Sequence, residues 1–435
     1  MRKQVVFTIV LVLLIGMLAG CGVSMPSSPS TSDPVVVQTE TFTAPLPVTD
    51  TPEVAATAAP QPTAPSGPAT CVVEPFPFPE EPRIPPVTEA DHVIGPEDAT
   101  ITFIEYADFQ CPACSALVGL KDYLLDKYKG DIRFVYRHLT LISIHDKAVI
   151  TAEGTEAAAA QGKFWEMYDL LYSRQVEWNG LSEEAMEKEL VKYAEELGLD
   201  TDQFAQELSE HIYRDAIIAA YEDYSQYGRL ATPTFVVNNT FYPTQELGGF
   251  GFLEPFISML QIKDRMYDAP PEQVIDPEKD YTATIRTEHG DIVVKLFADL
   301  APVNVNNFVF LAQDGWYDGV TFHRVITDFV AQGGDPSGSG MGGPGYRCAD
   351  EIVPDLTYDE PGMVGMASGG PGTSSIGSQF FITYVPLPQL TGNYTIIGQV
   401  IEGMDVLKQL TPRDPQQNPG APLGDVIETI IIEEQ

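Results

Sequence analysis

The sequence predicts a multidomain protein, in which an α/β domain with a helical insertion is followed by a closed β-barrel. Its 435 residues are more than one hydrophobic core usually organises. In residues 89–265, apolar strand candidates flank a long helical stretch, whereas residues 280–435 combine short apolar runs with glycine-rich loops. The formal net charge of −38 repels phosphate backbones, so nucleic-acid binding is not expected.

Residues 1–20 have the pattern of a secretory signal. Arg2 and Lys3 precede an apolar run, Val5–Leu18, that is short for a membrane span. The segment Leu18-Ala19-Gly20-Cys21 resembles the cleavage site of bacterial lipoproteins, which implies that Cys21 is lipidated. The alternative is an uncleaved anchor helix with an incidental cysteine. In both cases we expect the rest of the chain to lie outside the cytoplasm, attached to the cell envelope.

Two segments are predicted to connect rather than to fold. Residues 21–88 are rich in Pro, Thr, Ser and Ala without periodicity, which is typical of a disordered tether, and residues 266–279 form a shorter linker. Cys71 in the tether and Cys348 in the last domain are the cysteines that remain outside the motifs. Their even number in an oxidising compartment suggests a disulfide between them, the alternative being free or intermolecularly paired thiols.

Apolar patterns place the elements of the α/β domain. Apolar side chains at helical spacing follow the first strand, and in the helical insertion Ser182 is suited to begin a helix that Gly198 ends. The expected strands are residues 101–106, 131–137 and 231–237, and the expected helices are residues 116–128, several within 148–228, and 250–260.

A Cys-x-x-Cys motif, Cys111-Pro112-Ala113-Cys114, follows the first strand where a helix begins. The free N–H groups of a helix start stabilise a thiolate, so Cys111 is the expected nucleophile and Cys114 the resolving thiol. Half of a zinc site is the alternative, but no second pair of suitably spaced Cys or His residues accompanies the motif.

Phe109-Gln110-Cys111-Pro112-Ala113-Cys114 and Thr232-Pro233-Thr234 resemble the DsbA-like branch of the thioredoxin superfamily, over about residues 93–263. The resemblance implies that Pro233 is a cis proline and that Thr232 presents its backbone to an incoming peptide. It also implies that Glu105 is a buried acid that relays protons, the alternative being a strand-end residue facing solvent. Because Ala113 replaces the histidine of strongly oxidising relatives, extreme oxidising power is not expected.

The last domain is expected to begin with two strands, residues 281–286 and 292–296, joined around His289-Gly290. A short helix with Phe308 and Leu311 facing inward follows them. Four ordered segments then resemble the cyclophilin-type peptidyl-prolyl isomerases along essentially the whole domain. These segments are Phe322–Ile326, Phe329–Asp335, Met366–Pro371 and Gly377–Ile382.

An X-Pro isomerase must lower a barrier of about 18–20 kcal/mol, which comes from amide resonance. It does so with an apolar pocket for the proline ring and a cation that hydrogen-bonds the twisted amide. The resemblance implies that Arg324 is the catalytic guanidinium and that Gln332 supports it by a hydrogen bond; a surface charge paired with an acid is the alternative for Arg324. The remaining implied residues are Phe329, Val330, Phe381 and Leu390 in the proline pocket, and Gln379 with the Ser368 backbone on substrate peptide groups.

Two positions depart from the cyclophilin pattern, since Gln389 stands where many eukaryotic members have tryptophan and Tyr394 where they have histidine. We expect an extracytoplasmic folding enzyme with isomerase and thiol–disulfide oxidoreductase activities, needing neither cofactor nor metal. Its expected partners are unfolded or proline-containing polypeptides, a redox partner and the membrane. The alternatives are an isomerase whose α/β domain only docks clients, and a binding protein or chaperone without turnover.

Overall fold

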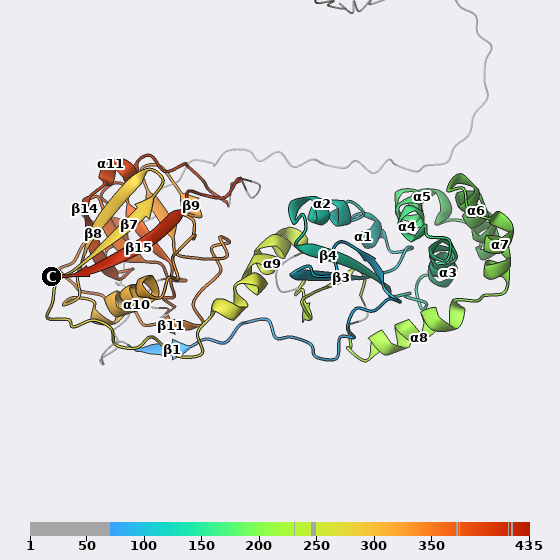
Figure 1. Ribbon diagram of the computed structural model, residues 1–435, viewed down its shortest axis with the longest axis horizontal. Helices are drawn as coiled ribbons and strands as arrows, with labels where there is room; N and C mark the ends of the chain where they lie inside the picture. Colours follow the sequence, from blue (N-terminus) through green and yellow to red (C-terminus); the bar gives the residue numbers. More distant parts are fainter. Residues whose placement is uncertain are drawn as a thin grey trace, which may run out of the picture. The chain divides into compact units, whose positions relative to one another are not determined.

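The computed structural model describes residues 70–229, 231–244, 249–370, 373, 375–415, 417–418 and 421–435 (Figure 1). The predicted signal segment, Cys21 and the tether as far as residue 69 lie outside these ranges. Within the described ranges, no helix combines the length and apolar character that crossing a membrane requires.

The α/β domain is built on a five-stranded sheet with the order β2-β4-β3-β5-β6. Its central strands, β3 and β4, are parallel, and the other neighbours are antiparallel. All three predicted strands of this domain are confirmed as β3, β4 and β5, with boundaries shifted by a few residues at most. The bounds are β2 His92–Ile94, β3 Ile101–Ala107, β4 Ile132–His138, β5 Thr234–Val237 and β6 Thr240–Phe241.

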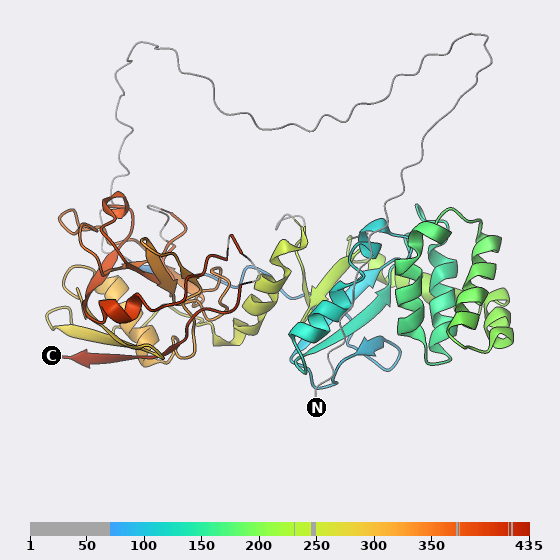
Figure 2. The same ribbon diagram turned by 90° about the horizontal axis from the view of Figure 1, so that it is seen from above.

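Helices flank this sheet, and the insertion between β4 and β5 forms a helical layer of its own (Figure 2). Ser182 begins helix α6 as predicted, because its hydroxyl accepts a hydrogen bond from the Ala185 N–H, and Gly198 follows its end with a positive φ of 72°. The helices of the domain are α1 Pro112–Ser115, α2 Leu120–Lys127, α3 Ala148–Ala159, α4 Phe164–Ser173, α5 Gln175–Trp178, α6 Glu183–Glu196, α7 Thr201–Ser209, α8 Arg214–Ser225 and α9 Leu253–Gln261.

The predicted tether, residues 21–88, needs a correction at its C-terminal end. Strand β1, Cys71–Val73, pairs antiparallel with β11, Tyr346–Cys348, and the predicted Cys71–Cys348 disulfide is confirmed within this pair. Further along, Phe78 packs edge-on against Phe256 of α9 and Ile84 is buried. Composition hid this order, because three paired residues and a few isolated aromatic side chains carry no periodic signal.

The last domain contains an eight-stranded sheet with the order β15-β7-β8-β14-β12-β13-β10-β9. The predicted opening hairpin and the helix α10, Pro302–Gln313, are both present. The sheet curls, and its two ends meet through backbone hydrogen bonds between residues 319–322 and 425–427, including an isolated bridge between Thr321 and Val426. It is therefore a half-barrel closed by loop segments. The bounds are β7 Tyr281–Thr287, β8 Gly290–Leu296, β9 Arg324–Val325, β10 Val330–Gly333, β12 Met363–Met366, β13 Phe380–Thr383, β14 Ile396–Glu402 and β15 Ile427–Glu434.

Each domain has its own apolar core. In the half-barrel, Phe308 and Leu311 of α10 pack with inward-facing side chains of β7, β8 and β15, as the period-two pattern of these strands requires. A separate small cluster forms outside this core around Phe381 and Val330. In the α/β domain the side chains of the helical insertion pack onto the segment that carries Cys111. Both candidate sites therefore adjoin rigid, packed surfaces.

Candidate functional site

The Cys-x-x-Cys motif lies at the carboxyl end of β3. Cys111 is the residue before α1, with extended backbone angles, and Pro112 occupies the first helical position, where its missing N–H costs no hydrogen bond. Cys111 is 6 % exposed and Cys114 only 1 %. Both cysteines are free thiols in this structure. Both cysteines of the motif are thus buried, Cys111 less completely than Cys114, as is expected of a nucleophile and a resolving thiol.

The surroundings separate the two thiols electrostatically. A hydrogen bond from the Cys114 thiol, assisted by the backbone N–H groups of Cys114 and Ala113, lowers the pKa of Cys111 to about 5. Burial raises the pKa of Cys114 well above its ordinary value. These contacts therefore favour the thiolate form at Cys111 and the protonated thiol at Cys114.

Thr232 and Pro233 lie beside the nucleophile. The Thr232–Pro233 peptide bond is cis, as the resemblance implied. When Cys111 is protonated, its thiol can donate to the backbone carbonyl oxygen of Thr232, with Sγ and O 3.4 Å apart. The loop before β5 thus brings main-chain polar groups to the sulfur that would attack a client.

Glu105 is buried, which decides between the two sequence-based alternatives for this residue. Its side chain is 3 % exposed, and its Oε2 accepts a hydrogen bond of 3.1 Å from the Tyr168 hydroxyl. Burial raises the pKa of Glu105 to about 8, despite the opposing effect of the Tyr168 hydrogen bond. Negative charge on Glu105 also raises the pKa of Cys114. An acid that titrates near neutral pH is suited to exchange protons with the buried thiol.

Sequence reasoning missed a buried polar network next to the Cys-x-x-Cys motif. The buried Asp108 carboxylate accepts hydrogen bonds from the Gln110 and Leu141 backbone N–H groups and pairs with His145 Nδ1, each at 2.8 Å. The hydrogen bond to Asp108 raises the pKa of His145, and the Cys111 thiolate acts in the same direction. No pattern in the sequence identifies this pairing, because a loop brings His145 back to the motif from 37 residues away.

In the half-barrel, three side chains expected in the isomerase site come from adjacent strands. Gln332 of β10 is the register partner of Arg324 on β9 and of Phe381 on β13. The Arg324 guanidinium lies over the Phe329 ring, 5.8 Å from its centroid. No acidic side chain of the described ranges forms an ion pair with Arg324, and its Nε atom is buried without a hydrogen-bond partner there. The guanidinium is thus available to an acceptor that a substrate would supply.

The predicted hydrogen bond between Gln332 and Arg324 needs a correction. The Gln332 side-chain amide instead donates to Gln379 Oε1 at 3.0 Å. Gln379 in turn donates to the carbonyl oxygens of Gly340 and Gly342, both at 3.0 Å. The Gln332 Nε2 group is therefore engaged by Gln379, and no hydrogen bond joins Gln332 to Arg324 among the described residues.

The predicted apolar pocket residues are brought together in one cluster beside Arg324. Phe381 and Val330 are buried in it, and Phe329 and Leu390 are partly exposed at its edge. Tyr394, at the position where many eukaryotic members were expected to have histidine, lies edge-on to Phe381 with centroids 5.6 Å apart. Sequence reasoning missed Tyr358 and Met363, which are buried in the same cluster and whose local sequence carries no sign of a pocket.

Ser368 lies near this groove, where the neighbouring Ala367 N–H donates to the Gln379 carbonyl oxygen at 2.8 Å. The Ser368 hydroxyl is used locally, donating to the Gly370 carbonyl oxygen at 3.2 Å. Gln389 is exposed in the short 3-10 turn Pro388–Leu390.

Comparison with known proteins agrees with this geometry. Residues 282–430 match the family described as cyclophilin type peptidyl-prolyl cis-trans isomerase, and residues 87–248 match the family described as thioredoxin. The Mycobacterium tuberculosis peptidyl-prolyl cis-trans isomerase A is 45 % identical over 170 residues, which are 35 % of this chain and 91 % of that protein. The chain belongs to the cyclophilin family.

Other cyclophilins give similar results. The Helicobacter pylori peptidyl-prolyl cis-trans isomerase is 42 % identical over 152 residues, covering 34 % of this chain and 85 % of that protein. A crystal structure of a Cryptosporidium parvum cyclophilin type isomerase is 39 % identical, with a TM-score of 0.33, and the match covers 36 % of this chain and 99 % of that one. The cyclophilin family match lies in the last domain, and the thioredoxin family match precedes it.

Proposed function

We propose that this chain is a protein-folding enzyme of the cell envelope, which isomerises X-Pro bonds and also exchanges thiols and disulfides. The observation that carries the isomerase assignment is Arg324, a guanidinium without an acidic partner in the described ranges, placed over Phe329. The apolar cluster around Phe381 lies beside it. Together they supply the two parts that an isomerase needs.

The isomerase reaction needs no covalent step. The proline ring of a client enters the apolar cluster, while the Arg324 guanidinium donates a hydrogen bond to the amide as it twists out of its plane. Twisting removes amide resonance and leaves a lone pair on the proline nitrogen, so this interaction is stronger in the transition state than in either planar state. Gln379, held between Gln332 and the Gly340–Gly342 carbonyl groups, fixes the groove in which the client backbone lies.

The exchange reaction uses Cys111 as the nucleophile. Its thiolate attacks a client disulfide, forming a mixed disulfide and releasing one client thiolate. Cys114 then loses its proton to the ionised form of Glu105 and attacks the Cys111 sulfur, which releases the second client thiolate and leaves a Cys111–Cys114 disulfide. The reverse sequence oxidises a client dithiol. A redox partner is required in either direction to restore the starting state.

Two observations support an envelope location. The segment Leu18-Ala19-Gly20-Cys21 favours lipidation and export. The Cys71–Cys348 disulfide is typical of compartments in which disulfides form and persist. Clients of such an enzyme are unfolded polypeptides with proline and cysteine residues. X-Pro isomerisation and disulfide exchange are both slow folding steps, so one chain that catalyses both is physically reasonable.

The test is a crossed pair of variants in the full chain. Arg324→Ala is expected to abolish isomerisation of an X-Pro tetrapeptide while insulin reduction persists, and Cys111→Ala is expected to give the opposite result. If Cys111→Ala leaves insulin reduction unchanged, the thioredoxin-like domain acts only in docking. If Arg324→Ala leaves isomerisation unchanged, the isomerase site is wrong. The reduction potential of the Cys111–Cys114 pair then distinguishes an oxidase from a reductase.

A further inference from the structure

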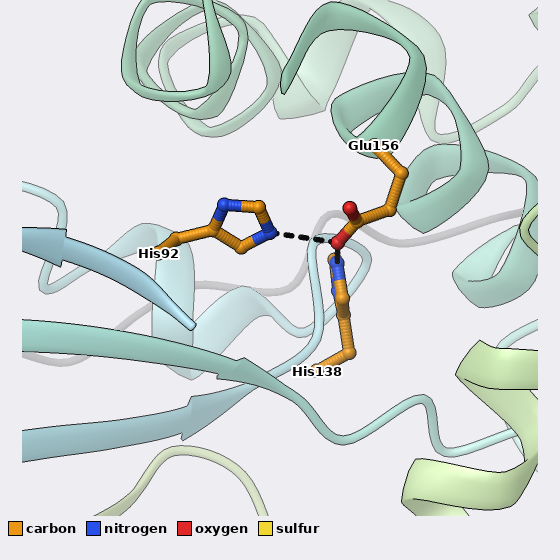
Figure 3. Close-up of side chains that lie close together, drawn as sticks. All are labelled: His92, His138 and Glu156. Carbon is orange, nitrogen blue, oxygen red and sulfur yellow. Dashed lines mark hydrogen bonds and ion pairs between the residues drawn. The ribbon is translucent and has the colours of Figure 1, made fainter. Parts of the chain in front are cut away.

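Two histidines and a glutamate converge at one point of the α/β domain (Figure 3), and none of them belongs to either candidate active site. They come from three elements: His92 from β2, His138 from the end of β4 and Glu156 from α3. His92 Nε2 lies 2.7 Å from Glu156 Oε1, and His138 Nε2 lies 2.9 Å from the same oxygen. His92 and His138 are 64 and 18 residues away from Glu156 in the chain, so the sequence contains no spacing that would identify this group.

The sheet explains why the two imidazoles meet. His92 on β2 is the register partner of Tyr136 on β4, two residues before His138. Since side chains alternate along a strand, His92, Tyr136 and His138 share one face of the sheet. The residues just before the histidines, Asp91 and Arg137, are joined by an ion pair of 2.6 Å. This ion pair links β2 to β4, and it pairs the charged side chains next to the two histidines with each other.

Both rings are fixed by aromatic neighbours. The His92 ring stacks on Phe164, with centroids 3.5 Å apart and planes 7° apart. The His138 ring lies edge-on to Tyr136 at 5.2 Å. Its Nδ1 atom is buried and has no hydrogen-bond partner in the described part of the chain, so the polar contacts of this ring run through Nε2 toward Glu156. The ligand atoms are therefore held in place before any ion arrives.

We propose that His92, His138 and Glu156 form a binding site for a zinc-class divalent cation, which shares no residue with the isomerase and dithiol sites. Two imidazoles with one carboxylate suit Zn²⁺ and similar first-row metals. Around a tetrahedral ion with bonds of about 2.0–2.1 Å, ligand atoms stand roughly 3.4 Å apart. The present separations of 2.7 and 2.9 Å need to widen by only a fraction of an ångström.

Partial exposure of the site leaves room for a fourth ligand. The side chains of His92 and Glu156 are 16 % and 23 % exposed, whereas that of His138 is 9 % exposed. Water therefore has access to one side, and a bound ion would have three protein ligands and an open position. Such an ion would fasten the edge strand β2 to helix α3.

A second group in the described residues, Glu288, His289 and Asp425, is less suited to a metal. It offers one imidazole, and Glu288 is exposed. The Asp425 carboxylate already accepts hydrogen bonds from the Thr411 N–H and hydroxyl groups. This group therefore provides the matched control.

The test uses the full chain with Cys111→Ser and Cys114→Ser, stripped with chelator, because thiolates of the dithiol site would themselves bind zinc. Calorimetric titration with Zn²⁺ is expected to give one ion per chain, and Zn²⁺ is expected to raise the melting temperature. His92→Gln and Glu156→Gln are each expected to weaken binding at least about tenfold, while His289→Gln leaves it unchanged.

His92 lies on the edge strand β2, so the variant His92→Gln is expected to stay folded even if a substitution of the more buried His138 is not tolerated. Circular dichroism checks that His92→Gln is folded. Absorption of bound Co²⁺ gives a second readout, since nitrogen and oxygen ligands impose a spectrum that His92→Gln alters. Absence of Zn²⁺ binding in the parent protein would overturn the proposal. Binding that survives His92→Gln and Glu156→Gln, or that is lost in His289→Gln, would overturn it as well.

Discussion

The Sγ atom of Cys111 lies 3.4 Å from the carbonyl oxygen of Thr232, so the nucleophile and the cis-proline loop meet although 121 residues separate them. A client in mixed disulfide with Cys111 would pass directly along the Thr232 backbone. The chemistry of Cys111 thus depends on both the motif and the loop, and its ionisation is the first property to measure.

The reduced protein is expected to react with iodoacetamide at Cys111 with an apparent pKa of about 5, because the Cys114 thiol and nearby N–H groups stabilise the thiolate. Cys114 should stay unmodified, since it is 1 % exposed and its pKa is raised. Cys114→Ala removes the largest stabilising contact and should raise the apparent pKa of Cys111. Peptide mass mapping identifies the alkylated residue, and a titration midpoint at the ordinary thiol value would contradict the assignment.

Glu105 predicts a specific pH dependence of stability. Its pKa is about 8 in the folded protein, because of burial, and near 4.5 when unfolded. Ionisation of Glu105 therefore favours unfolding. The stabilising contribution of the protonated Glu105 to the folded state is fully present below pH 4.5 and is lost as the pH rises through 8. Glu105→Gln should gain about 3 kcal/mol relative to wild type between roughly pH 5 and 8.

Chemical denaturation of the oxidised protein measures this difference, because oxidised cysteines do not titrate. Glu195→Gln, at an exposed position of α6, is the matched control and should show the wild-type pH profile. Parallel profiles for wild type and Glu105→Gln would show that Glu105 is not a buried titrating acid.

The Cys71–Cys348 disulfide joins β1 to the half-barrel across 277 residues of sequence. A cross-link over so long a segment restricts the unfolded chain, so the double variant Cys71→Ala and Cys348→Ala should lose about 2–5 kcal/mol of unfolding free energy. Isomerase activity should persist, because both cysteines lie outside the cluster around Phe381. A non-reducing peptide map of the wild-type protein should contain the linked peptides, and their absence would refute the pairing.

Much of the fold was predictable because local pattern and burial agree. The apolar run of β3, the cap at Ser182 and the stop at Gly198 each express a local preference that tertiary packing reinforces. Strand β1 was not predictable, since its order comes from pairing with β11 and from a disulfide. The number of cysteines suggested the Cys71–Cys348 disulfide, but the pairing of β1 with β11 leaves no trace in local composition.

In the candidate sites too, residues in local motifs were predictable, whereas contacts between distant parts of the chain were not. Ordered motifs identified Arg324 and Cys111, because their neighbours in the chain are also their neighbours in space. The partner of Gln332 was predicted wrongly, since the amide turns to Gln379 on another strand. The Asp108–His145 pair and the His92–His138–Glu156 group were invisible in the sequence, because each depends on where a loop or helix returns.

The isomerase site is tested most directly by kcat/KM for cis-trans isomerisation of an X-Pro tetrapeptide, compared between wild type, Arg324→Ala and Arg286→Ala. Arg286 is an exposed arginine of the same domain, paired with Asp291, and its variant should retain wild-type activity. Arg324→Ala should lower kcat/KM by about 100-fold or more, as expected when a donor to the transition state is removed. Equal activity of the two variants would contradict the account.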